Sequence, residues 1–508
     1  GLRKNGNMAY HTTIYLFLFF PATIIAYQLM PVKYRWYVLL LFSYYFYYCI
    51  SGTLMIYIMA ATMITYVSGL LIEKKKGFLI FGILLLIGTL AYMKYYNFFA
   101  ANGNRILKLI SSEQPFSLKT IILPIGISFY TLSAAGYLID VYYKKIPAER
   151  QIGKLALFFA FFPTVMEGPI CRYGELEKNL FAGHRITMER LAAGIQRIFW
   201  GLLKKMLVAD RLNVLVKTVY DGYQNYDGTV IGVAAVAYTI QLYMEFSGCM
   251  DIVIGTGEIF GITLPENFRR PFFSKTVSEF WRRWHISLGS WLKEYVFYPV
   301  SMCGPVRKLS KTVRKRNRHW GEVTAAALGL FPVWLCNGIW HGPRWSYIFY
   351  GFYYFTLILL SIALRPWSDK MRSILRLERH PVIYELFQIG RTCLLVVIGE
   401  LFFRAEGLRI GLNMFIRLLT QFQPSSFWNG TLLTLGLDRW DFMVIGAALV
   451  FVFLVSLAEE RGRNVRQDIK MLPLPLRWSI YYSVMLAVCL FGAYGVGYLP
   501  VELIYANF

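Results

Sequence analysis

Long apolar runs recur along the whole chain and are separated by short polar or basic stretches. A bilayer-spanning helix needs about 20 apolar residues. The runs that meet or approach this length are 12–30, 36–50, 54–72, 78–93, 229–244, 321–341, 345–365, 386–403, 440–458 and 477–496. Further runs, at 117–140, 153–170 and 190–208, are broken by Pro, Gly or charge. This pattern predicts an all-α polytopic membrane protein with about ten to thirteen membrane-embedded helices.

The composition agrees with this fold class. Of the 508 residues, 56% are hydrophobic and 16% are charged, whereas a soluble protein has about 25% charged residues. No Ser/Gly-rich linker and no convincing internal repeat divides the chain. We therefore expect one transmembrane domain over residues 8–508, preceded by a polar tail at residues 1–7.

The net charge of +24 is concentrated between the apolar runs. Between Arg307 and Arg318, for example, there are only basic charges and no acidic ones. The favoured interpretation is the positive-inside rule together with attraction to anionic membrane lipid. It places the loop at 307–318 in the cytoplasm and the N-terminus outside. A docking surface for a phosphorylated cosubstrate is the alternative. Nucleic acid is not expected as a partner, because the basic residues are scattered between spans.

Two histidines lie in or beside these apolar runs, His285 and His341. An ionisable side chain at membrane depth costs a few kcal/mol, so such a residue is a functional candidate by default. Imidazole is also the side chain best suited to accept a proton near neutral pH.

His341 follows Asn337 by four residues, and Trp340 directly precedes it. On a helix, Asn337 and His341 share a face, so the amide is expected to hydrogen-bond the imidazole and fix its tautomer. Gly342-Pro343 should end the helix there. A histidine that only packs within the bundle is the alternative.

His285 follows Arg282 and Arg283 and precedes Ser287. The basic neighbours should lower the pKa of His285. Aromatic and leucine residues at helical spacing predict an amphipathic helix over 277–298, at the interface or leading into a cavity. A general base, a substrate-positioning residue and a merely interfacial histidine all remain open. No HxxxH or HxH spacing occurs, so no metal site is predicted.

Other polar residues are weaker candidates. Glu400 and Arg404 are four apart and are expected to pair on one helix face. No nucleophile elbow, Walker loop or dinucleotide fingerprint is present.

Several sequence blocks together resemble the membrane-bound O-acyltransferase family in its bacterial branch. The blocks are LPIGISFYTLSAAGYLIDVY (123–142), FFPTVMEGPICRY (161–173), QLYMEFSGCMDIVIG (241–255), the FWRRWHISL-containing stretch 266–300, the WHG-containing stretch 336–354, GELFFRA (399–405) and the terminal ELIYANF. Within that branch the chain resembles proteins that O-acetylate alginate, peptidoglycan and other polysaccharides. The proteins that transfer D-alanine to teichoic acid are more distant.

The resemblance implies helices around a central funnel or pore, with His341 as the catalytic histidine and His285 as the second one. Asn337, Trp340 and Ser287 would support them. It also implies a bacterial cytoplasmic membrane protein that transfers a short acyl group, most often acetyl. The cosubstrate would be a cytoplasmic thioester such as acetyl-CoA or an acyl-carrier protein, and no bound cofactor is expected. The acceptor would be a polysaccharide hydroxyl or a separate extracytoplasmic acyltransferase.

The donor's phosphates are expected to be attracted by basic side chains, namely Arg282, Arg283, Lys293, Arg314, Lys315 and Arg316. Base catalysis by His341 and an acyl-histidine intermediate both remain open. Two rival functions remain as well: D-alanyl transfer from a carrier protein, and a transporter or scaffold without chemistry.

Overall fold

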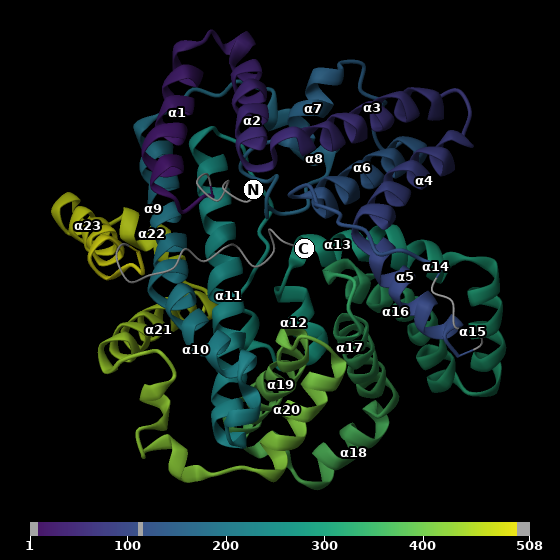
Figure 1. Ribbon diagram of the computed structural model, residues 1–508, viewed down its shortest axis with the longest axis vertical. Helices are drawn as coiled ribbons and strands as arrows, with labels where there is room; N and C mark the ends of the chain where they lie inside the picture. The colour runs from purple at the N-terminus through teal and green to yellow at the C-terminus, as the bar shows by residue number, and fades with distance from the viewer. Residues whose placement is uncertain (1–8, 110–114, 495–508) are drawn as a thin grey trace. The chain divides into compact units, whose positions relative to one another are not determined.

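Helices follow one another along the whole of the described chain (Figure 1). The computed structural model describes residues 9–109 and 115–494. The polar tail at 1–7 and the terminal ELIYANF block lie outside these ranges. No β-strand occurs in them; Phe268 and Trp284 form an isolated β-bridge.

Within the described ranges, eight helical stretches are long and apolar enough to cross a membrane. They are Val32–Ile72, Phe78–Leu107, Gly228–Ile259, Arg318–His341, Trp345–Ala363, Pro381–Arg404, Arg439–Glu460 and Leu474–Phe491. A shorter apolar stretch covers Tyr15–Leu29. The all-α, polytopic fold class is thereby confirmed. The expected ten to thirteen helices also included segments that only nearly span a bilayer. The central funnel or pore stays a prediction.

The chain forms two compact units, and the single domain over 8–508 also stays a prediction. The first unit comprises the described residues up to Leu202 together with Gly248–Glu266. Its α-helices are α1 (Phe20–Leu29), α2 (Arg35–Ser51), α3 (Met55–Ile72), α4 (Phe78–Leu90), α5 (Tyr96–Leu107), α6 (Ile127–Tyr142), α7 (Ile152–Ala160), α8 (Tyr173–Leu180), nearly all of α9 (Met188–Leu203) and the end of α11 (Gly228–Ile259).

Aromatic side chains and one partly exposed ion-pair cluster hold the first unit together. The rings of Tyr10, Tyr15, Phe46 and Phe162 pack on one another, and the Tyr10 hydroxyl donates a hydrogen bond to the Phe162 carbonyl at 2.9 Å. Such rings bury large apolar areas and prefer these edge-to-face and offset arrangements. Between α9 and the end of α11, Arg197 pairs with the carboxylates of Asp251, Glu258 and Glu266.

The second unit comprises Leu203–Ser247 and the described residues from Asn267 onward. After the first part of α11 its α-helices are α12 (Val277–Arg283), α13 (Ile286–Leu292), α14 (Tyr298–Met302), α15 (Gly304–Arg316), α16 (Arg318–His341), α17 (Trp345–Ala363), α18 (Arg365–Ile374), α19 (Pro381–Arg404), α20 (Leu408–Thr420), α21 (Arg439–Glu460), α22 (Val465–Lys470) and α23 (Leu474–Phe491), with α10 (Asp210–Asp221) before α11. Two π-helical segments, Lys204–Ala209 and Lys293–Phe297, adjoin α10 and α14.

The basic stretch 307–318 was expected to be a loop and is instead mostly helical. Residues up to Arg316 belong to α15. Pro305 lies near the N-terminus of this helix, which ends before Asn317. The Asn317 side chain accepts a hydrogen bond from the Trp320 N–H at 3.1 Å and so caps α16. Long basic side chains are good helix formers, and α15 packs against α16, which explains the difference.

The WHG-containing stretch 336–354 lies at the end of α16 and the start of α17. Glycines let these two helices approach closely (Figure 1). A Cβ on Gly351 would lie 2.3 Å from the Trp334 carbonyl oxygen, and one on Gly338 would lie 2.5 Å from the Tyr347 carbonyl oxygen. Small residues at such positions are typical of helix pairs in membranes.

Gly351→Ala is expected to destabilise the protein, because the added methyl group would meet a backbone carbonyl that cannot move away cheaply. Overpacking of this kind costs about 1–3 kcal/mol. Thermal unfolding in detergent, monitored through the monodispersity of the sample, measures the effect. The matched control is Gly390→Ala on α19, where nothing lies within 4 Å of the added Cβ. The control should keep the wild-type Tm, and an equal Tm for both variants would contradict the close approach of α16 and α17.

Candidate active site

His341 is the last residue of α16 and is held by Asn337, one turn earlier. The His341 Nε2 lies 3.2 Å from the Asn337 Oδ1, and both side chains are buried. With the amide oxygen as acceptor, Nε2–H is the donor and Nδ1 carries the lone pair. The predicted contact between Asn337 and His341 is confirmed, and it leaves Nδ1 as the basic nitrogen.

The helix ends at His341, as Gly342-Pro343 predicted. Gly342 has φ 145°, a backbone conformation that favours glycine, and its N–H bonds to the Ile339 carbonyl at 3.0 Å. Non-helical backbone at membrane depth is tolerated only where protein buries it or a wet cavity accepts it. The imidazole therefore lies where a spanning helix stops.

Aromatic rings from two other helices enclose the His341 imidazole. Phe403 of α19 meets it edge-on at 4.9 Å between centroids, and Tyr350 of α17 meets it edge-on at 5.9 Å. The Tyr350 hydroxyl donates a hydrogen bond of 2.8 Å to Glu400 Oε1, which fixes the ring. Trp340 is buried beside them. The sequence reasoning did not single out Tyr350 or Phe403, although both lie in blocks that carry the family resemblance.

The expected pairing of Glu400 with Arg404 is wrong. Glu400 is fully buried and accepts its hydrogen bond from Tyr350, whereas the Arg404 guanidinium lies over the Tyr220 ring, 5.3 Å from its centroid. No ion pair joins Glu400 and Arg404 in the described structure. The partners from α17 and α10 replace the helical neighbour that the spacing suggested.

The helix predicted over 277–298 is interrupted at Trp284 and His285. Trp284 is extended, with φ −113° and ψ 130°, and His285 is left-handed, with φ 48° and ψ 50°. Two backbone hydrogen bonds hold this break against the preceding segment: Arg269 N–H to the Arg283 carbonyl at 2.9 Å, and Ile286 N–H to the Asn267 carbonyl at 3.0 Å. A left-handed L-residue costs about 1–2 kcal/mol, so these tertiary contacts override the helical spacing.

Asn267 organises the start of α13 and was missed by the sequence reasoning. Its Oδ1 accepts the Ser287 backbone N–H at 2.9 Å and lies 3.4 Å from the His285 Nδ1. The first N–H groups of a helix have no partner inside the helix, so Asn267 satisfies one of them. Ser287 therefore contacts Asn267 through its backbone amide, and its predicted supporting role stays a prediction. No local spacing pointed to Asn267, because it lies 18 residues before His285.

Burial lowers the pKa of His285 to about 3. The direction agrees with the prediction, but the cause is burial and not the neighbouring arginines. A group with so low a pKa stays neutral at pH 7 and is a poor proton acceptor there. His285 is therefore better suited to hydrogen bonding and positioning than to base catalysis.

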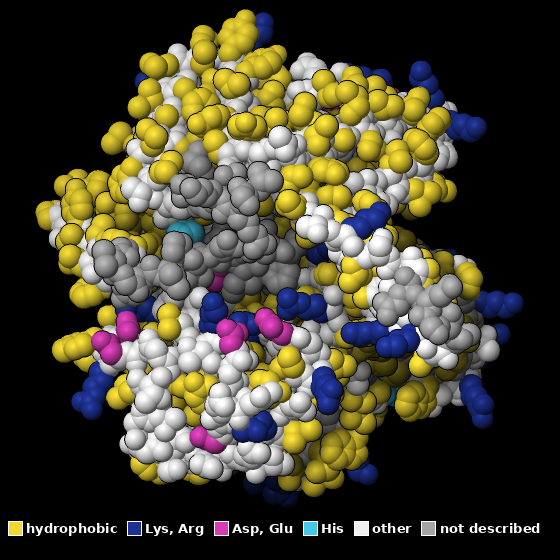
Figure 2. All heavy atoms as spheres, in the orientation of Figure 1, with side chains coloured by type: hydrophobic (Ala, Val, Ile, Leu, Met, Phe, Trp, Pro, Cys, Tyr) yellow, Lys and Arg dark blue, Asp and Glu magenta, His cyan; other side chains and the backbone are white. Residues whose placement is uncertain are grey.

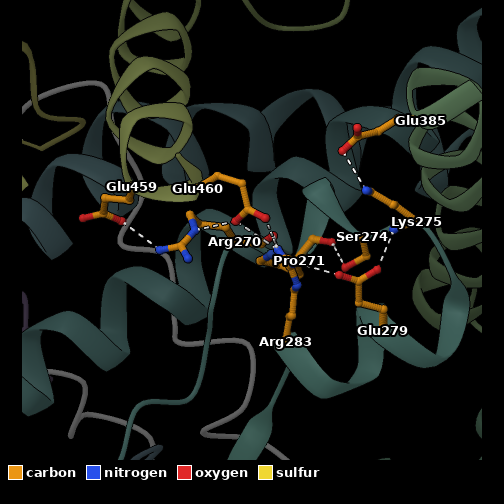
Figure 3. A network of polar contacts seen from close by, with 9 residues as sticks. All are labelled: Arg270, Pro271, Ser274, Lys275, Glu279, Arg283, Glu385, Glu459 and Glu460. Atoms are coloured by element: carbon orange, nitrogen blue, oxygen red, sulfur yellow. Dashed lines mark hydrogen bonds and ion pairs between the residues drawn. The ribbon is translucent and has the colours of Figure 1, made fainter. Parts of the chain in front are cut away.

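Figure 3 shows the ion-pair network that fixes the segment leading to His285. Glu460, at the end of α21, accepts from Arg270 Nε at 2.7 Å and from Arg283 at 2.9 Å. Arg283 also donates to Glu279 at 2.7 Å. Lys275 pairs with Glu385 of α19 at 2.9 Å. A network of several charges holds geometry better than an isolated surface pair.

The residues predicted to bind the donor differ in their surroundings. Arg283 is already neutralised by two glutamates, which makes it less suited to binding the phosphates of the donor. Arg282 is exposed, and the exposed Lys293 lies over the Tyr298 ring, with Nζ 5.7 Å from its centroid. The remaining three, Arg314, Lys315 and Arg316, are exposed in the last turn of α15.

One aromatic cluster connects the two histidine-bearing segments. Trp281 of α12 lies four residues before His285, and its ring centroid is 4.8 Å from that of Tyr354 and 5.0 Å from that of Trp334. It also lies 6.1 Å from Tyr350, whose ring in turn contacts His341. The α12 helix therefore packs on the same α16–α17 pair that ends at His341.

These features define a polytopic membrane protein with a buried histidine site. Comparison with known proteins identifies the family within this class. The sequence model of the MBOAT, membrane-bound O-acyltransferase family, matches residues 151–394. The chain is 34% identical to the probable alginate O-acetylase of Pseudomonas aeruginosa, over 80% of this chain and 74% of that protein. It is 26% identical to the peptidoglycan O-acetyltransferase of Helicobacter pylori, over 80% and 79% of the two chains. It is 29% identical to the teichoic acid D-alanyltransferase of Bacillus subtilis, over 58% and 76%.

The chain belongs to the membrane-bound O-acyltransferase family. It is a multi-pass membrane protein and an O-acyltransferase, so transport or scaffolding without chemistry is no longer a rival reading.

Acidification is expected to destabilise the protein through His285. Below pH 6.5 the unfolded chain's imidazole takes up a proton, whereas the folded one stays neutral down to about pH 3. Stability therefore falls as the pH decreases below 6.5, by on the order of 2 kcal/mol at pH 5. Tm values at pH 7 and pH 5 measure this loss. The His285→Gln variant keeps a hydrogen-bonding side chain but cannot titrate, so it should lose less stability on acidification. The same pH dependence in both proteins would refute the assignment of a buried neutral imidazole.

Proposed function

We propose that this protein transfers an acetyl group from a cytoplasmic thioester to a hydroxyl on the extracytoplasmic side of the bacterial cytoplasmic membrane. The acceptor is a polysaccharide hydroxyl or a separate extracytoplasmic acyltransferase that acylates the polysaccharide. The observation that carries the proposal is the buried His341, held by Asn337 where a spanning helix ends. Acetyl is favoured over D-alanyl because the O-acetylating relatives match 80% of the chain, against 58% for the D-alanyltransferase.

In the proposed reaction, His341 Nδ1 takes the proton of the acceptor hydroxyl. The hydroxyl oxygen attacks the thioester carbonyl carbon, a C–O bond forms and the C–S bond breaks. The proton then passes from the imidazolium to the leaving thiolate. Asn337 holds the imidazole in the required tautomer throughout. In a second route the same nitrogen attacks the thioester carbonyl carbon, an N–C bond forms, the C–S bond breaks and the thiolate leaves. The acceptor hydroxyl then attacks the acyl-imidazole, a C–O bond forms as the N–C bond breaks, and the hydroxyl proton goes to the thiolate.

His285 has a different part in this proposal. A neutral imidazole at the N-terminus of α13 positions the donor or acceptor by hydrogen bonding. The cationic side chains Arg314, Lys315 and Arg316 attract the phosphates of the donor.

His341→Ala is expected to abolish acyl transfer while the protein stays folded. Loss of a general base lowers the rate about 10²–10⁴-fold, which is about 3–5 kcal/mol of barrier. The measurement is acyl transfer per monodisperse protein. His285→Ala should reduce transfer less completely, because its role is positioning.

His319→Ala is the matched control, since His319 lies near the other end of the same helix, where its Nε2 is 2.9 Å from the Ala363 carbonyl oxygen and its ring contacts Trp320. It should transfer at the normal rate. If the His341→Ala protein keeps more than about a tenth of wild-type activity, a loss below about 1.4 kcal/mol, His341 is a packing residue and the mechanism is wrong. Mass spectrometry after incubation with donor alone distinguishes the two routes, because only the second leaves an acyl group on His341.

Neutralising Arg314, Lys315 and Arg316 together to glutamine should raise the donor's KM and weaken the salt dependence of KM. Salt screens exposed charges over about 8–10 Å, so the effect is largest at low ionic strength. Neutralising Lys74, Lys75 and Lys76 removes the same charge from the turn between α3 and α4 and should leave KM unchanged. An unchanged KM in the first variant at low salt would leave these residues only the roles of topology and lipid attraction.

A further inference from the structure

A cavity of about 420 Å³ opens between α14, α15 and α16, apart from the histidine site. Arg307 and Lys311, one helical turn apart on α15, lie on one side. Apolar side chains, among them Ala325 and Ala326 of α16, form the opposite wall. The cavity is therefore cationic on one side and apolar on the other. Its volume is in the range of pockets that hold small ligands.

Two hydroxyl groups also line this cavity. The Ser301 and Ser310 side-chain oxygens are buried, and neither has a hydrogen-bond partner within the described residues. A buried polar group without a partner costs about 1–3 kcal/mol, so such groups in a native protein require an explanation. A ligand with several oxygen atoms would satisfy both hydroxyls.

The charges around the cavity call for an anion. The α15 residues Arg307, Lys308, Lys311, Arg314, Lys315 and Arg316 form no ion pair in the structure as described. Figure 2 shows Lys and Arg side chains, and no Asp or Glu, along the outer edge where α15 lies in Figure 1. The N-terminal end of α15, where the cavity lies, adds the positive end of the helix dipole.

The surroundings place this cavity at a membrane surface. The helix directly after α15 is the spanning helix α16. Exposed apolar side chains flank the cavity, namely Met302, Leu309 and Trp320. A basic helix with exposed apolar residues is typical of the headgroup layer of a bilayer. Basic pockets between helices at this level are suited to anionic headgroups.

We propose that this cavity binds the headgroup of an anionic phospholipid. Arg307, Lys311 and the two serine hydroxyls contact the phosphate, and the alanine-lined wall contacts the glycerol and the start of an acyl chain. A water-soluble phosphate compound would use the cations and hydroxyls but not the apolar wall. The site is distinct from the proposed donor-binding residues Arg314, Lys315 and Arg316, none of which lines the cavity.

The test uses the purified full-length protein in nanodiscs containing phosphatidylglycerol and phosphatidylcholine, followed by native mass spectrometry of the retained lipid. Wild type is expected to retain one phosphatidylglycerol in preference to phosphatidylcholine. The double variant Arg307→Gln/Lys311→Gln should lose this preference at least tenfold. Lys315→Gln/Arg316→Gln removes the same charge from the same helix and should keep the preference within twofold. Equal losses in both variants, or no loss in either, would overturn the proposal.

Two further arms separate the lipid from other anions and from the chemistry. Ala326→Met fills the apolar wall without changing charge, and it should weaken retention in protein that remains monodisperse. Inorganic phosphate or coenzyme A at millimolar concentration should not displace the lipid; full displacement would identify the site as one for soluble anions. The donor's KM should be unchanged in the Arg307→Gln/Lys311→Gln variant. A raised KM with unchanged lipid retention would assign the cavity to the donor instead.

Discussion

A polar group that enters the membrane must find its partner inside the protein, and this constraint governs the second unit. His341 contacts Asn337, Glu400 Oε1 accepts from Tyr350, and the fully buried Lys205 pairs with Asp210 at 2.8 Å. Each contact replaces water that the bilayer cannot supply. Because a buried polar group without a partner is costly, each pair also fixes the position of the side chains involved. The rigidity that an active site needs follows from the same contacts that make burial possible.

The two histidines meet this constraint in different ways, and the roles proposed for them differ accordingly. His341 is held within its own helix and lies at the end of that helix. His285 is held by a distant amide, in a left-handed conformation that only tertiary contacts maintain. Burial there lowers the pKa of His285 to about 3, which keeps the ring neutral. A base must accept a proton near the working pH, which fits the positioning role proposed for His285.

The sequence predicted what depends on local spacing and missed what depends on tertiary contact. Apolar runs located the long helices, and the four-residue spacing located the contact between Asn337 and His341. The break at Trp284–His285 has no Gly or Pro to mark it; backbone pairing with the segment at 267–269 causes it. Asn267 could not be found, since its role exists only after that pairing forms. Glu400 and Arg404 had the right spacing, but other helices offered each a different partner.

The end of α16 is also the place where the proposed reaction brings a polar acceptor to a buried histidine. The last carbonyl groups of a helix have no donor within the helix, so the membrane-embedded end at His341 already needs polar surroundings. A hydroxyl-bearing acceptor is least costly to admit where the backbone itself requires hydrogen bonds. Gly342, with φ 145°, turns the chain at this point, where an added Cβ would lie 3.0 Å from the Tyr347 ring. Phe403 and Tyr350 orient the imidazole, and the proposed mechanism requires that a polar reactant reach it at this helix end.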